Sequence, residues 1–112
     1  MIDLETHKLL VIARARRVCY WIAEDRGTKE LLGVVKFMET GSRMKGAFPK
    51  HMDAKQAESI FDQRIRMDAS DQGETPDIEH FYPPLDCDDA ELLDWLLATG
   101  VVKIIQTTRT VN

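Results

Sequence analysis

Apolar residues in the first forty positions occur in short runs that fit strands better than helices. The run Leu9–Ile12 would point in every direction around a helix, so it would give no apolar stripe. The β-branched and aromatic residues that follow favour extended backbone. We therefore predict strands over Lys8 to Ala13, Val18 to Ala23 and Glu30 to Met38.

The connection between the second and third of these strands allows two interpretations. In the first, Glu24 to Lys29 is a hairpin loop, and Gly27 supplies a left-handed backbone angle. In the second, the fold is mostly α with a helical hairpin at residues 7–40, in which Gly27 ends one helix and Thr28 begins the next.

The middle of the chain predicts a basic loop, a helix and a second loop. Residues 41–46 (Gly-Ser-Arg-Met-Lys-Gly) are bounded by glycines and indicate a loop. Asp53, with Gln56 three residues later, is typical of a helix N-terminus, so we expect a helix from Ala54 to about Met67. Residues 69–77 are small, polar and acidic, which predicts a mobile acidic loop.

The last third predicts a short strand, a second helix and a final strand. Ile78 to Tyr82 could form the short strand, a helix begins at Asp88 or Asp89 and ends at Gly100, and Val101 to Thr108 is β-branched. The predicted fold is α+β: a three-stranded antiparallel meander followed by two helices and a C-terminal strand, with a single sheet covered by helices. Residues 1–112 form a single domain in this interpretation.

Composition narrows the setting of the protein. The chain of 112 residues is 44% hydrophobic, which suffices for one core. Its N-terminus lacks a cationic start followed by an apolar run, and no apolar stretch is long enough to cross a bilayer. We therefore expect a cytoplasmic protein with no membrane partner, in which Cys19 and Cys87 remain reduced.

Charge is distributed unevenly along the chain. Residues 1–50 carry ten Lys and Arg and six Asp and Glu, whereas residues 51–112 carry five and thirteen. From Asp68 to Asp94 there are ten acids and no Lys or Arg. This contrast predicts a strongly dipolar surface and permits self-association between basic and acidic faces.

The motifs of common enzymes and metal sites are missing from the sequence. The acidic cluster that begins at Asp86 has Glu91 where a calcium loop needs glycine. The histidines His7, His51 and His80 have no zinc-ligand spacing, and we expect ordinary surface or capping roles for them. We predict no catalytic residue, no cofactor and no metal, and favour a non-enzymatic role.

Two hypotheses of function follow from the charges. The first is a non-catalytic interaction or regulatory protein, such as a small phage-type inhibitor, whose acidic segment binds a basic surface of a partner protein or other macromolecule. Its predicted binding residues are Asp77, Glu79, Phe81, Tyr82, Asp86, Asp88, Asp89, Glu91 and Asp94. The second is a small nucleic-acid- or nucleotide-binding domain. Its predicted phosphate-binding residues are Arg14, Arg16, Arg17, Arg43 and Lys45.

Overall fold

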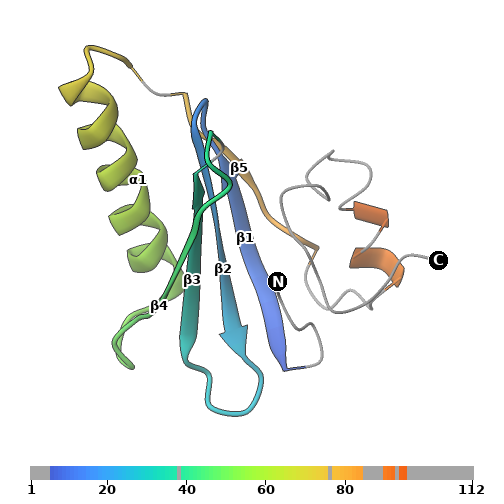
Figure 1. Ribbon diagram of the computed structural model, residues 1–112. Helices are drawn as coiled ribbons and strands as arrows, with labels where there is room; N and C mark the ends of the chain where they lie inside the picture. Colours follow the sequence, from blue (N-terminus) through green and yellow to red (C-terminus); the bar gives the residue numbers. More distant parts are fainter. Residues whose placement is uncertain (1–5, 38, 76, 85–89, 93, 96–112) are drawn as a thin grey trace.

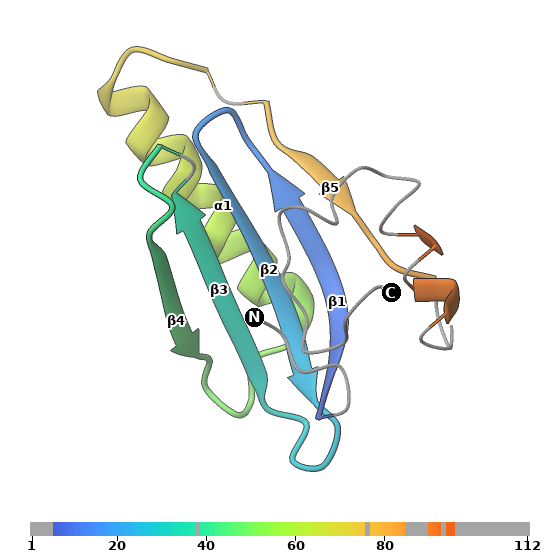
Figure 2. The same ribbon diagram turned by 45° about the vertical axis from the view of Figure 1, so that its right-hand side comes forward.

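The computed structural model contains an antiparallel sheet with a long helix on one face (Figure 1). The structure describes residues 6–37, 39–75, 77–84, 90–92, 94 and 95. The elements are β1 (His7–Arg14), β2 (Val18–Asp25), β3 (Leu31–Phe37), β4 (Arg43–Ala47), α1 (Ala54–Asp71) and β5 (Glu79–Phe81). The strands lie in the order β4-β3-β2-β1-β5, and every neighbouring pair is antiparallel (Figure 2).

The strand interpretation is confirmed over residues 7–37, as is the α+β class, and the helical hairpin is wrong. Apolar side chains run without a break from Leu9 to Ala13 of β1 because the sheet buries both of its faces there. A register shift between Leu9 and Val11 marks a bulge. Leu10 and Val11 consequently pack on the α1 side, whereas Leu9 and Ile12 pack on the other side.

The meander has four strands, so the prediction of a loop over residues 41–46 is wrong. Gly41 turns the chain with a φ of 73°, and the Phe37 N–H donates to the Ser42 carbonyl at 2.9 Å. Residues 43–47 then pair with β3 as the edge strand β4. Side chains alternate between the two faces of β4, with Arg43 and Lys45 on one face and Met44 on the other, and all but the partly buried Arg43 are exposed.

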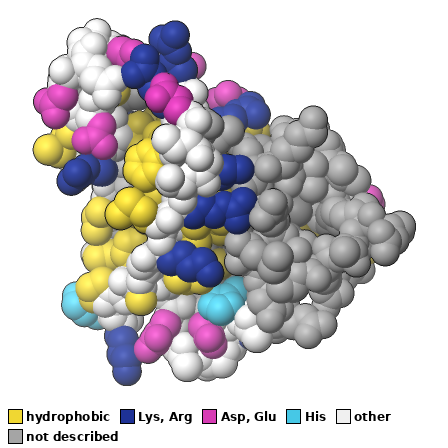
Figure 3. All heavy atoms as spheres, in the orientation of Figure 1, with side chains coloured by type: hydrophobic (Ala, Val, Ile, Leu, Met, Phe, Trp, Pro, Cys, Tyr) yellow, Lys and Arg dark blue, Asp and Glu magenta, His cyan; other side chains and the backbone are white. Residues whose placement is uncertain are grey.

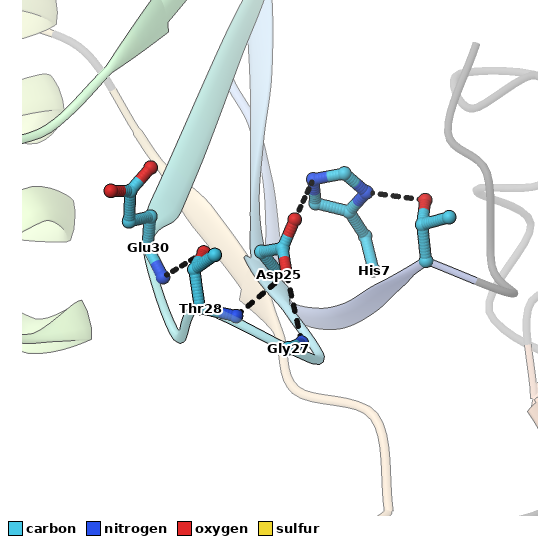
Figure 4. Close-up of polar contacts among 6 residues, drawn as sticks. His7, Asp25, Gly27, Thr28 and Glu30 are labelled. Atoms are coloured by element: carbon cyan, nitrogen blue, oxygen red, sulfur yellow. Dashed lines mark hydrogen bonds and ion pairs between the residues drawn. The ribbon is translucent and has the colours of Figure 1, made fainter.

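The loop between β2 and β3 is held by the side chain of Asp25 (Figure 4). Its Oδ1 accepts the backbone N–H groups of Gly27 at 2.8 Å and Thr28 at 2.9 Å. These two hydrogen bonds, of which the one from Thr28 has the larger effect, hold the pKa of Asp25 below its ordinary value. The left-handed residue of this loop is Lys29, with a φ of 66°, and not Gly27 as predicted. Local carboxylate hydrogen bonds define the turn, and the glycine serves as a donor in it.

The predicted helix cap is confirmed. The Asp53 side chain accepts the Gln56 N–H at 2.8 Å, and the Gln56 side chain accepts the Asp53 N–H at 3.0 Å, which is a capping box. The helix continues to Asp71, beyond the predicted end at Met67, so it includes the first residues of the predicted 69–77 loop.

The two faces of the sheet carry separate apolar clusters. On one face, residues of α1, Ala57 and Phe61 among them, pack over Tyr20 and its neighbours. On the other face, Leu92 and Trp95 pack against a cluster that includes the fully buried Trp21. The second cluster places helical residues 90–92, 94 and 95 across the sheet from α1 (Figure 1).

The remaining predictions fare as follows. The strand predicted at Ile78 to Tyr82 is confirmed as β5, and it pairs with β1 at the sheet edge. The rest of the predicted second helix and the final strand at Val101 to Thr108 lie outside the described residues. None of the helices described here has the length and apolar character needed to cross a membrane.

Candidate functional site

A groove of about 1130 Å³ separates α1 from the β3 and β4 side of the sheet. Its floor is apolar because Phe61 of α1 packs on Tyr20 of β2 and on Phe48, which follows β4. The helix therefore covers the centre of the sheet and leaves part of the outer strands uncovered. Figure 3 shows hydrophobic side chains gathered on the α1 side of β4. Met44, which lines the groove, is 63% exposed.

Strand β4 forms the rim of this groove and is an edge of the sheet. It pairs only with β3 within the part of the chain that the structure describes, so its outer backbone groups face away from the ladder. At Gly46, which pairs with Gly33 on the α1-facing side of the sheet, a β-carbon would meet no atom within 4 Å, so this face of β4 is open. An edge with unpaired N–H and C=O groups is a template for a further strand.

The face of β4 away from α1 is basic. Arg43 lies opposite Lys36, and Lys45 lies opposite Val34, whose side chain belongs to the cluster on that face. Neither Arg43 nor Lys45 forms an ion pair with a described residue. The rim of the groove thus presents positive side chains on one face and apolar surface on the other.

The residues predicted to bind phosphate do not form one patch. Arg14 pairs with Glu79 at 3.3 Å, and Arg17 pairs with Glu74 at 3.0 Å. Three strand spacings, or about 14 Å, separate Arg14 from Arg43 along their shared register row. Arg16 is exposed in the turn between β1 and β2. The structure therefore divides the predicted set between a largely ion-paired turn and the β4 edge.

The predicted acidic surface is described only in part. Glu79 is engaged by Arg14, and the Phe81 ring packs against the core with the Arg14 guanidinium 5.4 Å from its centroid. Asp77 is exposed, and so are Glu91 and Asp94. Asp86, Asp88 and Asp89 lie outside the described residues.

A second polar feature, the His80 cluster, joins β2, α1 and the β5 segment. It consists of Tyr20, Glu58, Asp62, His80 and Tyr82. The Tyr20 hydroxyl donates to Asp62 Oδ1 at 2.6 Å, and His80 Nε2 lies 2.8 Å from Asp62 Oδ2 and 3.3 Å from Glu58 Oε1. The Tyr82 hydroxyl donates to Glu58 Oε1 at 2.5 Å, and its ring stacks on the imidazole of His80.

Burial and hydrogen bonding raise the pKa values of both tyrosines of the His80 cluster. Burial, and then the hydrogen bond to Asp62, raise the pKa of Tyr20 far above its ordinary value. Burial and the hydrogen bond to Glu58 raise the pKa of Tyr82 to about 12. Both hydroxyls consequently stay protonated as donors throughout the neutral range, and they orient the two carboxylates.

Sequence reasoning missed the His80 cluster because His80 has no partner nearby in the sequence. A signal was present in the helix. Glu58 and Asp62 are four residues apart and lie next to the inward-facing Ala57 and Phe61, where carboxylates are unexpected unless they have partners.

Comparison with known proteins adds no relative. No protein-family model, curated protein or solved structure matches the chain. The groove and the β4 edge are therefore the features that bear on function.

Proposed function

We propose that the protein is a non-catalytic interaction protein that binds an extended segment of a partner protein beside β4. The observation that supports this is the edge strand itself, with an apolar groove on one face and the cations Arg43 and Lys45 on the other. Main-chain hydrogen bonds to the open edge would hold the segment, and its alternate side chains would face the groove and the basic side.

The charges on β4 specify the partner segment. Residues that pair with Arg43 and Lys45 across strands favour Asp or Glu, because opposite charges stabilise such pairs by about 0.2–1 kcal/mol each. Residues on the other face would contact Met44 and occupy the open space over Gly46 on the α1-facing side, so they would be apolar. The expected ligand alternates acidic and apolar residues.

A second copy of the chain fits this edge poorly. Antiparallel pairing of two β4 strands centred on Met44 would bring Arg43 opposite Lys45, and centring on Lys45 would bring two lysines together. Like charges directly opposite each other destabilise a pair of strands. The edge thus disfavours self-pairing while remaining open to an acidic segment.

Selection from a library of random eight-residue peptides tests the proposal. The purified protein is used as bait, and enriched peptides are measured by fluorescence anisotropy at low salt. We expect peptides that alternate acidic and apolar residues, whose amide contacts map to β4 by NMR. The double variant Arg43→Glu, Lys45→Glu should weaken binding by about 1–2 kcal/mol, or five- to thirtyfold.

The matched control is the double variant Lys55→Glu, Arg66→Glu, which makes the same charge change on exposed positions of α1. It should leave peptide affinity within twofold of wild type. An equal loss of peptide affinity in both double variants would show that net charge alone causes the effect, and it would contradict the proposal. Enrichment of basic peptides that depend on Asp77, Glu91 and Asp94 would instead favour the acidic-segment hypothesis.

A further inference from the structure

Three potential metal-ligand atoms converge between α1 and β5 in the His80 cluster. Nε2 of His80 and one carboxylate oxygen each from Glu58 and Asp62 lie within 4.8 Å of one another. The side chains are sheltered, with exposed fractions of 22%, 16% and 10%. We propose that these residues form a binding site for a divalent transition-metal ion of the Zn²⁺ type.

The two separations between His80 and the carboxylates are close to those around such an ion. Donors bound at 2.0–2.1 Å in a tetrahedron lie about 3.3–3.4 Å apart. His80 Nε2 and Glu58 Oε1 are already 3.3 Å apart, and the 2.8 Å separation from Asp62 Oδ2 would widen slightly. Glu58 and Asp62 are about 6 Å apart along the helix axis, so side-chain rotation alone brings both carboxylates to one ion.

The surrounding tyrosines provide the outer support that metal sites require. The Tyr20 hydroxyl engages Oδ1 of Asp62, which orients Oδ2 toward the imidazole. Tyr82 stacks on His80 with an interplanar angle of 11° and donates to Glu58. Because Tyr20 is fully buried and Tyr82 is 57% exposed, an ion would enter from the Tyr82 side and leave one coordination position for water.

The donor set selects the class of ion. Two carboxylate ligands suit a divalent cation. An imidazole nitrogen among the donors favours Zn²⁺ and its first-row neighbours over Mg²⁺ and Ca²⁺, which prefer oxygen ligands alone. The site lies beside β5, across α1 from the β4 edge, so it is independent of the peptide-binding proposal.

Calorimetric titration of the full chain with ZnCl₂ at neutral pH tests the site. We expect one equivalent to bind, with MgCl₂ giving at least tenfold weaker binding. The variants Glu58→Gln and Asp62→Asn keep acceptors for the tyrosine hydroxyls and should each weaken Zn²⁺ binding at least tenfold. Asp68→Asn removes a carboxylate from the same helix outside the site and should bind Zn²⁺ like wild type.

A direct readout keeps the test decisive if a variant fails to fold. The ring-nitrogen resonances of His80 in the ¹⁵N-labelled wild-type protein should shift as Zn²⁺ saturates the site. Zn²⁺ binding with unchanged His80 resonances, or with equal affinity in Glu58→Gln and wild type, would overturn the proposal. Absence of any Zn²⁺ binding would overturn it as well.

Discussion

The substitution Gly33→Ala should test how tightly Phe61 and Phe48 pack over β3. Gly33 lies in β3 beneath two aromatic rings, and a β-carbon there would lie 2.6 Å from Phe61 Cζ and 2.7 Å from Phe48 Cε2. Both separations are well inside van der Waals contact. Phe61 cannot simply rotate away, because it packs between Tyr20 and Phe48 with centroid distances of 4.8 and 5.3 Å.

The expected magnitude follows from comparison with the opposite residue on β4. Overpacking a core by one methyl group costs about 1–3 kcal/mol. Alanine also restricts the unfolded chain more than glycine does, which offsets about 0.5–1 kcal/mol at either site. Gly46 pairs directly with Gly33, and a β-carbon there meets nothing within 4 Å. Gly33→Ala should therefore be about 1–3 kcal/mol less stable than Gly46→Ala.

Urea unfolding followed by Trp fluorescence and circular dichroism measures this difference. With a urea slope of about 1–3 kcal/mol per M, the midpoint of Gly33→Ala should fall roughly 0.3–3 M below that of Gly46→Ala. Adding Phe61→Leu to Gly33→Ala should restore part of the loss, with a coupling of at least about 0.5 kcal/mol. If the two alanine variants have equal midpoints, the packing of Phe61 and Phe48 over Gly33 is wrong.

Three further predictions concern titration and reactivity. Folding raises the pKa of both tyrosines of the chain, so tyrosinate absorbance should increase only above about pH 11 in the folded protein. In urea it should increase near pH 10. A transition near pH 10 in the folded protein would contradict the hydrogen bonds of Tyr20 and Tyr82. Because folding lowers the pKa of Asp25, its carboxylate stabilises the fold at higher pH, and this contribution is lost as the pH falls below about 4. Urea titrations at successive pH values should therefore show a smaller loss of stability for Asp25→Asn than for the wild-type protein over that range. Cys19 is buried, and burial raises the pKa of its thiol. In a Cys87→Ser variant, thiol reagents should therefore modify Cys19 only at the rate of unfolding. Immediate modification without denaturant would contradict the position of Cys19 in the core.

The fold could be predicted wherever local pattern and burial agree. Strands β1 to β3 were predictable because β-branched and aromatic residues fill central positions that are buried on both faces. The helix start was predictable because Asp53 and Gln56 form a purely local capping box. Strand β4 was missed because an exposed edge strand needs no apolar run, and its glycines suggested a loop.

Tertiary contacts decide the functional features, which explains why the sequence predicted less about them. The arginines at 14 and 17 looked available for phosphate, but the fold brings Glu79 and Glu74 to them from far along the chain. His80 looked isolated because its partners Glu58 and Asp62 come from α1. Spacing along the sequence carries no information on such pairs, apart from the two carboxylates on an apolar helical face.

The sheet order also implies a sequence of folding events. Strands β1 to β4 pair with their neighbours along the chain through short turns, so these hairpins can form early with little loss of loop entropy. Strand β5 has three residues and pairs with β1, which lies far from it in the sequence, so β5 should dock last and open first. Amide hydrogens of β5 would then exchange faster than those of β2. His80 arrives with β5, so the last step of folding also completes the cluster around it.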